Sequence, residues 1–260
     1  MWPQGKRFAV AFTFDFDAEE VWLGEDPRNA TRPGVLSQGL YGAKVAVPAI
    51  LELLGRHGIT GTFFVPGRVA ERHAARVREI VDAGHELAHH GYRHVGPATL
   101  TYDQEEAELV QGKEVLGRFG AEIVGYRSPS WDFSPHTLEL LELHGFVYSS
   151  NLMDDVRPYR HEGRSIVELP VQWILDDAAH LWFGPDEWTK KISTTSEVRE
   201  IWEEELRGIR DMGGCCILTM HPQVIGRPGR LRFLDGFLRF VTGLNDAWIT
   251  TCREIAATVP

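Results

Sequence analysis

Short apolar runs alternate with longer amphipathic segments along most of the sequence. The short runs are typical of buried strands, and the longer segments are typical of helices that pack one face on a core. Strands are expected at residues 8–14, 60–65, 85–88, 123–126, 146–149, 166–171, 215–220 and 248–250. Helices are expected at residues 44–57, 68–82, 103–119, 134–144, 197–212 and 231–244. Strands that alternate with helices predict a parallel sheet.

Glycine and proline mark several of the expected element boundaries. Gly58, Gly84 and Gly120 each follow a helical segment. Ser134 before Pro135 is typical of a helix start, because proline fits the first turn. Residues 19–42 are polar and rich in Gly and Pro, so they are expected to form a long loop. Loops of that length are often functional.

The residues that carry the most chemistry lie at the ends of the expected strands. They are Asp15, Asp17, His90, Arg127 and His221. In a parallel barrel the carboxyl ends of the strands share one face, and active sites lie on that face. The sequence therefore predicts an α/β fold, a (β/α) barrel, with these side chains gathered at one end.

The composition is ordinary for a globular protein. Of the 260 residues, 43% are hydrophobic and 25% are charged, and no repeat or linker divides the chain, so one domain over residues 1–260 is expected. The formal net charge is -10, and the basic residues are scattered among a larger number of acids. A nucleic-acid binder would show a basic patch or stripe, so no nucleic-acid partner is expected.

The three cysteines and the first residues bear on the compartment. Cys215 and Cys216 are adjacent in an apolar run, and Cys252 makes the count odd, so buried thiols in a reducing compartment are expected. No signal peptide is recognisable, and no segment approaches the roughly 18 apolar residues of a membrane span. A cytoplasmic protein without a membrane partner is therefore expected.

The first motif is the stretch TFDFD, which ends in Asp15 and Asp17. If the strand continued through both acids, its period of two would point them to one side. One carboxylate could then bind a metal ion while the other handled protons. Alone this signal is weak, because two acids in a solvated loop give the same pattern.

The second motif is a histidine cluster that includes His90 and His94. On a helical turn this spacing places both rings on one face, which is a common way to bind zinc. A surface cluster or core histidines are the plain alternatives. Together with a strand-end aspartate, two histidines leave a metal ion open positions for water and substrate.

Two further motifs supply a cation and a proton donor. Arg127, in the stretch RSPSW, can hold a carboxylate in a fixed fork, or can simply cap a loop. His221 follows the apolar run ending in Leu218-Thr-Met. A histidine there can protonate a leaving group. Taken alone, His221 fits a structural hydrogen bond better.

Together, in this order, the motifs resemble those of the polysaccharide deacetylase family, the NodB-homology group also called carbohydrate esterase family 4. The family's TFDD-like, HxxxH, RxP and LxxH motifs are matched by TFDFD, HGYRH, RSP and LTMH, between residues 8 and 221. The resemblance implies a distorted (β/α) barrel. It also implies one divalent metal ion, zinc in the first place, with cobalt or nickel as alternatives.

The resemblance also implies roles for individual residues. The implied metal ligands are Asp17, His90 and His94. Asp15 would be the general base, Arg127 would hold Asp15, and His221 would be the general acid. Phe16 separates two acids that are adjacent in the commoner pattern, which leaves the division of roles between them open.

The TFDFDAE variant resembles a narrower branch, which contains intracellular peptidoglycan-deacetylase-like proteins, cyclic imidases and metal-free allantoinases. Because this chain keeps all three ligands, the resemblance implies a metal-dependent hydrolase of non-peptide carbon–nitrogen bonds that forms homo-oligomers. A small cyclic amide, imide or ureide is the favoured substrate. An N-acetylated sugar, as in peptidoglycan, is the alternative. A non-catalytic sugar-binding member and a structural metalloprotein are further alternatives.

Two sets of residues are candidates for the surroundings of the site. Five aromatic residues could line a pocket, although core packing is the plainer reading for each of them: Trp22, Tyr41, Trp131, Trp173 and Trp182. Four acids form two pairs, one member of which is a candidate to orient His221: Asp154, Asp155, Asp176 and Asp177. The sequence does not distinguish among these four.

Overall fold

The computed structural model describes residues 2–184 and 190–260. Its centre is a sheet of nine strands in the described part of the chain. The strands are β1 (Phe8–Asp15), β2 (Thr62–Val65), β3 (Glu86–His89), β4 (Gly125–Tyr126), β5 (Tyr148–Ser149), β6 (Tyr159–Arg160), β7 (Val167–Glu168), β8 (Cys215–Met220) and β9 (Ala247–Ile249).

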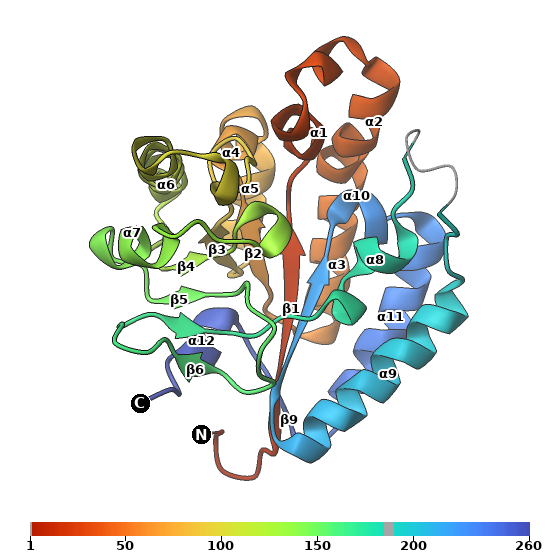
Figure 1. Ribbon diagram of the computed structural model, residues 1–260. Helices are drawn as coiled ribbons and strands as arrows, with labels where there is room; N and C mark the ends of the chain where they lie inside the picture. Colours follow the sequence, from red (N-terminus) through yellow and green to blue (C-terminus); the bar gives the residue numbers. More distant parts are fainter. Residues whose placement is uncertain (1, 185–189) are drawn as a thin grey trace.

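The strand order is β6-β7-β5-β4-β3-β2-β1-β8, and β9 pairs with β1. Every pairing is parallel except that of β6 with β7. The sheet is curled, and β6 and β8 are the two ends of its hydrogen-bonded order (Figure 1). The prediction of an α/β fold with a distorted (β/α) barrel is therefore confirmed.

Strands β1 and β8 form the middle of the core. All residues of both strands are buried, as expected for parallel strands covered on both faces, which have continuous apolar sequences. β1 pairs with β8 along nearly its whole length on one edge. Its other edge pairs with β9 near the start of β1 and with β2 near its end. This central position fixes where the acids at the end of β1 lie.

Helices cover the outside of the sheet (Figure 1). They are α1 (Glu20–Glu25), α2 (Pro33–Tyr41), α3 (Val47–His57), α4 (Gly67–Arg72), α5 (Ala74–Asp82), α6 (Tyr102–Gly117), α7 (Thr137–Leu143), α8 (Asp177–Leu181), α9 (Thr195–Met212), α10 (Pro222–Ile225), α11 (Pro228–Thr242) and α12 (Cys252–Ala256). The sheet and these helices bury one large apolar cluster and a smaller one.

The segment at residues 19–42 differs from its prediction, because it is helical rather than a loop. It contains α1, the short 3-10 helix η1 (Pro27–Thr31) and α2. The prolines that suggested a loop occupy first-turn positions, where proline fits a helix. We call residues 19–42 the covering segment, because α1 and α2 lie above the end of β1 (Figure 1).

The covering segment touches the rest of the protein through glycines. A methyl group added at Gly24 would overlap the carbonyl oxygens of Arg93 and His94. One added at Gly39 would overlap the main chain of Ala18 and Glu19. Close approach of two backbones requires the absence of a side chain, which explains these glycines inside helices.

We expect Gly24→Ala to lower the free energy of unfolding by about 1–3 kcal/mol, because the added methyl group forces two main-chain segments apart. Urea unfolding monitored by circular dichroism measures the change. Gly34→Ala is the matched control, since Gly34 lies in α2 with no atom near its missing Cβ. The control is expected to be neutral or slightly stabilising. Equal stability of the two variants would contradict the close contact.

Two smaller predictions also need correction. The helix expected at residues 68–82 is broken at His73, whose backbone φ of -118° and ψ of 37° lie outside the helical region, so α4 and α5 are separate. The helix expected from residue 134 begins at Thr137, and the Oγ atom of Ser134 instead accepts a hydrogen bond from the backbone of His136. Most other boundaries differ from the prediction by a few residues.

One helical stretch in the described residues has the length and composition of a membrane span, contrary to the expectation from sequence. It runs through α2, the π-helical turn η2 (Gly42–Ala46) and α3, over Pro33–His57, with a mean hydropathy of 1.2. A single such helix is weak support for a membrane span, because a core helix passes the same test. In α3, Val47, Ile50, Leu53 and Leu54 are buried in the core.

Candidate active site

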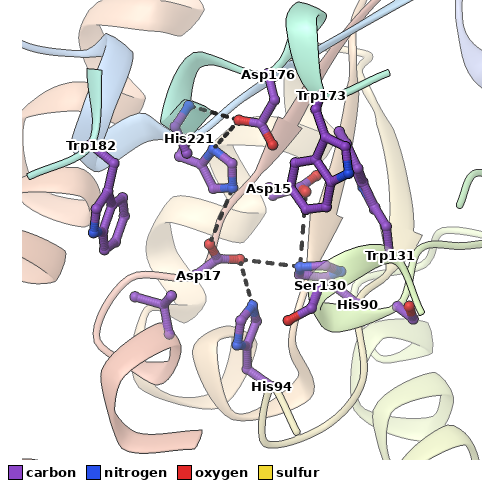
Figure 2. A pocket seen from close by; sticks show the side chains of 13 residues that line it. Asp15, Asp17, His90, His94, Ser130, Trp131, Trp173, Asp176, Trp182 and His221 are labelled. Carbon is purple, nitrogen blue, oxygen red and sulfur yellow. Dashed lines mark hydrogen bonds and ion pairs between the residues drawn. The ribbon is translucent and has the colours of Figure 1, made fainter. Parts of the chain in front are cut away.

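The predicted site residues meet around one cavity at the carboxyl ends of β1, β3, β4 and β8 (Figure 2). The cavity has a volume of about 220 Å³. Five of the six predicted site residues line this cavity: Asp15, Asp17, His90, His94 and His221. The sixth, Arg127, lies directly behind Asp15.

Arg127 is fully buried and holds Asp15 in place. Its Nη1 atom donates hydrogen bonds to Asp15 Oδ1 at 2.7 Å and to Thr13 Oγ1 at 2.9 Å. The guanidinium group also lies over the ring of Phe64, 4.1 Å from its centroid. Burial by itself would raise the pKa of Asp15, but the charges of Arg127, His90 and His221 and the hydrogen bond from Arg127 together outweigh burial, and the pKa lies below its ordinary value. Asp15 is therefore ionised at neutral pH.

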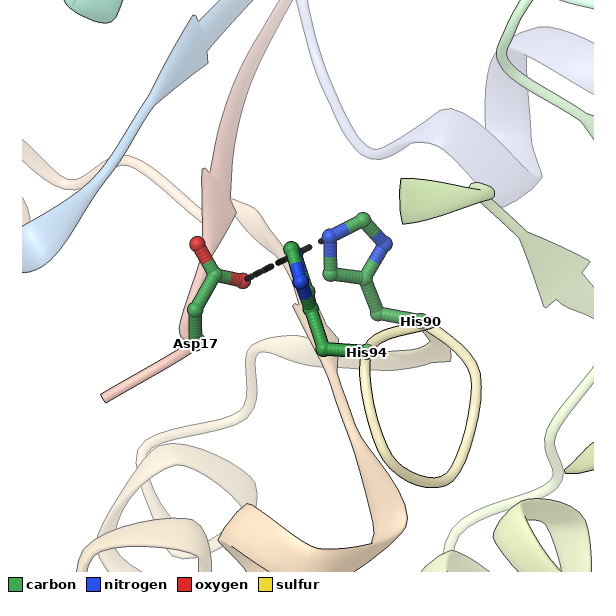
Figure 3. Close-up of side chains that lie close together, drawn as sticks. All are labelled: Asp17, His90 and His94. Carbon is green, nitrogen blue, oxygen red and sulfur yellow. Dashed lines mark ion pairs between the residues drawn. The ribbon is translucent and has the colours of Figure 1, made fainter. Parts of the chain in front are cut away.

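Asp17, His90 and His94 converge on one point (Figure 3). Asp17 Oδ1 lies 3.4 Å from His90 Nε2 and 3.7 Å from His94 Nε2. The expected helical turn between the histidines is absent. His90 directly follows β3, and the chain returns through a loop to His94, whose φ of 58° is left-handed. The two rings converge because this loop turns back.

The protonation states of the histidines suit metal binding. His90 Nδ1 lies 2.8 Å from the carbonyl oxygen of Arg127, so Nδ1 carries the proton and Nε2 offers a lone pair. Burial lowers the pKa of His90 and lowers that of His94 well below its ordinary value. Both rings are therefore neutral, which is the form that binds metal ions.

Asp17 lacks a partner for one buried oxygen. Oδ1 has no hydrogen bond to any described residue, while Oδ2 accepts a long hydrogen bond of 3.4 Å from Gln223 Nε2. Burial raises the pKa of Asp17 to about 8. An ionised carboxylate in this position is costly without a cation. One carboxylate with an orphaned oxygen and two neutral imidazoles therefore fit a divalent metal ion such as zinc.

His221 lies on the opposite side of Asp17 from the two other histidines (Figure 2). Its Nε2 atom is 3.9 Å from Asp17 Oδ2. Its Nδ1 atom lies 2.7 Å from Asp177 Oδ1, and its backbone N–H donates to the same carboxylate. Burial would lower the pKa of His221, but the charges of Asp176 and Asp177 raise it well above its ordinary value. The ring is therefore held as a proton donor.

Asp177 is thus the acid that orients His221, a choice that the sequence left open. Asp176 lies farther from the ring, at 3.6 Å, and lines the cavity. The other acidic pair lies elsewhere, where Asp154 accepts from Tyr159 and Asp155 accepts from two backbone N–H groups. Gln223 was missed altogether, because a glutamine behind a histidine has no sequence signal of its own.

Three of the five aromatic candidates line the cavity. Trp131 and Trp173 pack together with ring centroids 4.7 Å apart, and Trp182 lies near His221. Trp22 stacks on Trp182 and faces a neighbouring cavity. Tyr41 does not line the main cavity; it donates to the carbonyl oxygen of Gly226 and packs under Arg227.

Backbone strain is concentrated at this cavity. In the described part of the chain, the non-glycine residues with positive φ are Ala18, His94, Ser130 and Trp131. Each costs roughly 1–2 kcal/mol relative to the right-handed region. Ala18 follows Asp17, and the other three line the cavity. Strain of this kind persists where the surrounding structure enforces it, often at functional sites.

Comparison with known proteins agrees with the geometry. A family described as "Polysaccharide deacetylase" matches residues 38–149. A peptidoglycan deacetylase from Helicobacter pylori is 30% identical over 96% of both chains. The structure of a putative polysaccharide deacetylase from Mycobacterium smegmatis is 44% identical, covers 99% of this chain and 91% of its own, and superposes with a TM-score of 0.95.

A third relative shares the fold at lower identity. The structure of PuuE allantoinase is 22% identical, with coverage of 98% of this chain and 91% of its own and a TM-score of 0.85. At that identity the likeness concerns the fold alone. The H. pylori relative, by contrast, is 30% identical over nearly the whole of both sequences. This chain belongs to the polysaccharide deacetylase family.

Proposed function

We propose that this protein hydrolyses a non-peptide carbon–nitrogen bond, using one divalent metal ion held by Asp17, His90 and His94. The observation that carries the proposal is the orphaned Asp17 Oδ1 atom facing two neutral histidines. An ionised Asp15 and a protonated His221 flank this point. A base, a metal site and an acid in one cavity are the parts that amide hydrolysis needs.

The metal ion, when bound, would polarise the substrate carbonyl and make an attacking water more acidic. Asp15 accepts the proton of that water, and Arg127 keeps the Asp15 carboxylate ionised and fixed. His221 then donates its Nε2 proton to the departing nitrogen. An amine leaves poorly without that proton, so the raised pKa of His221 serves the reaction. Asp177 fixes the ring, which keeps Nε2 directed into the cavity.

The size of the cavity favours a small substrate. Its volume of about 220 Å³ lies below the range of roughly 300–1,000 Å³ typical of sites for drug-sized ligands. Trp131, Trp173 and Trp182 supply flat apolar walls. A cyclic amide, imide or ureide therefore fits best. The name of the H. pylori relative favours the alternative, an N-acetyl group on a peptidoglycan sugar.

A substrate panel on zinc- or cobalt-loaded protein tests this choice. Ring opening is expected for succinimide, hydantoin or allantoin, without acetate release from chitooligomers or peptidoglycan fragments. Trp173→Ala should raise KM for the small substrate, and Trp248→Ala, far from the cavity, is the matched control. Acetate release with no ring opening would overturn the substrate preference while leaving the hydrolase proposal intact.

Treatment with a chelator distinguishes a metal-dependent enzyme from a non-catalytic binding protein. Turnover should disappear on chelation and return with zinc, cobalt or nickel. A non-catalytic sugar-binding member would bind its ligand without turnover under both conditions. A structural metal site would be closed by four protein ligands. Here the donor cluster contains three ligands among the described residues, and it faces the cavity.

We further propose that the protein assembles into a homo-oligomer through the covering segment and the turn after it. Leu40 and Val45 are nearly half exposed there, in an apolar helical stretch. Light scattering is expected to show an oligomer that Leu40→Glu weakens. Leu143→Glu, at a more exposed position on α7, is the control and should have no effect. A concentration-independent monomer would contradict the proposal.

A cytoplasmic location also remains our proposal. Cys215, Cys216 and Cys252 are free and buried, and burial raises the pKa of each thiol. Such thiols are inert and fit a reducing compartment. Fractionation of the source cells would place the protein directly.

A further inference from the structure

A second cavity lies behind the covering segment, away from the metal cluster. Its volume is about 510 Å³. Residues of α1, η1 and α2 form one wall, and α4 and the loop after β3 form the other. In Figure 1, α1 and α2 stand beside α4 above the sheet. None of the groups assigned to hydrolysis lines this cavity.

Three arginines line this second cavity, Arg68, Arg72 and Arg93. Glu19 is the acid that lines it, and that carboxylate is paired with His73 at 2.7 Å. Three cations thus line the cavity beside one acid, while Glu20 and Glu108 balance their charge from behind the wall. Charge of one sign in a cavity raises the local concentration of ligands of the opposite sign.

The carboxylates that pair with these arginines are buried behind them. Glu20 is 1% exposed and pairs with Arg72, and more loosely with Arg68 at 3.8 Å. Glu108 accepts from Arg93 Nε at 2.6 Å. The acids therefore position the guanidinium groups without occupying the cavity.

Each guanidinium keeps donors to spare. An arginine has five N–H groups. Arg68 and Arg72 form ion pairs with Glu20 but no hydrogen bond to it, and Arg93 uses Nε on Glu108. The remaining guanidinium nitrogens have no partner in the described part of the chain. Arginine forks of this kind match the oxygens of phosphate and carboxylate groups.

We propose that the second cavity binds a small oxyanion, a phosphate or carboxylate group, between Arg68, Arg72 and Arg93. The groups come from α4 and from the loop after β3, so one anion would tie these two segments together. The proposal does not depend on the reaction assigned to the first cavity.

The second cavity is coupled by contact to the metal ligands. Helix α1 separates the cavities, with Val21 lining the first and Leu23 lining the second. Gly24 of α1 lies against the carbonyl oxygens of Arg93 and His94. An anion held by Arg93 would therefore restrict both α1 and the loop that carries His94.

Calorimetric titration of the full chain with inorganic phosphate and, separately, with succinate tests the proposal. Chloride at matched ionic strength is the control for screening. Binding of either anion is expected, and which one binds identifies the source of the oxyanion. Hydrogen exchange should slow in residues 20–25 and 91–95 at saturation. No binding of either anion below about 10 mM would overturn the proposal.

Variants locate the anion. Arg68→Gln is expected to weaken binding about tenfold or more, because it removes a charge-assisted hydrogen bond to the anion. Arg239→Gln, an exposed arginine on α11 with a similar ion pair, is the matched control and should bind normally. If Arg68→Gln does not fold, Arg68→Lys keeps the charge and removes the fork, and a smaller loss is expected. Normal binding by a folded Arg68 variant would place the anion elsewhere and overturn the proposal.

Discussion

Asp17→Asn is expected to lose the divalent ion and nearly all turnover, whereas Asp15→Asn is expected to keep the ion. The reason is geometric. Asp17 Oδ1 is the atom that faces His90 and His94, while Asp15 Oδ1 is occupied by Arg127. Asparagine at position 15 removes a proton acceptor but no metal ligand. Turnover should then fall by about 10²- to 10⁴-fold, the usual contribution of a general base.

Metal content and turnover must be measured on the same preparations. Elemental analysis should give one ion per chain for the parent and for Asp15→Asn, and much less for Asp17→Asn. His94→Ala should also lose the ion. Asp154→Asn is the matched control, because Asp154 is an acid outside the cavity. Reversed metal contents in the two aspartate variants would mean that their roles are interchanged.

Asp177→Asn is expected to lower kcat by about 10²- to 10⁴-fold while leaving the metal content unchanged. The Asp177 carboxylate accepts from both the ring and the backbone N–H of His221. An amide there can present N–H to Nδ1, which favours the neutral ring protonated only at Nε2, and that ring is a far weaker acid than the imidazolium. The loss should fall on kcat rather than on KM, because the ring acts on the departing nitrogen.

Asp176→Asn separates this role from the general effect of nearby negative charge. Asp176 lies 3.6 Å from the His221 ring and makes its hydrogen bond to Ala178 instead. Its replacement should reduce kcat by a smaller factor than that of Asp177. Equal losses in the two variants would indicate that charge, rather than ring orientation, governs His221.

Most strands, though not β6, and the grouping of the candidate site residues could be predicted because their signals are local. The apolar run at residues 215–220 became β8 without change, and the parallel arrangement follows from alternation with helices. Parallel strands bring their carboxyl ends to one edge, which gathered Asp15, His90 and His221 around one cavity. No contact between distant side chains had to be known for this step.

What could not be predicted depends on contacts between distant parts of the chain. Asp177 and His221 are 44 positions apart, and nothing near Asp177 distinguishes it from the acid beside it. The left-handed turn at His94 is stabilised by its surroundings rather than by its own preference. Gly24 and Gly39 suggest a loop when the sequence is read locally. In the structure they lie in helices, where the missing side chain lets the helix contact another main-chain segment.

The main-chain contacts of Gly24 and Gly39 also affect which residues of the covering segment can change among relatives. The covering segment is attached to the chain beside the metal ligands through main-chain atoms, at Ala18 on one side and at His94 on the other. Main-chain contacts do not depend on the identity of neighbouring side chains. We infer that Val21 and Trp22, on the same segment, can be exchanged among relatives without disturbing the ligands. Changes in the covering segment could then reshape the cavity while Asp17 and His94 beneath it keep their positions.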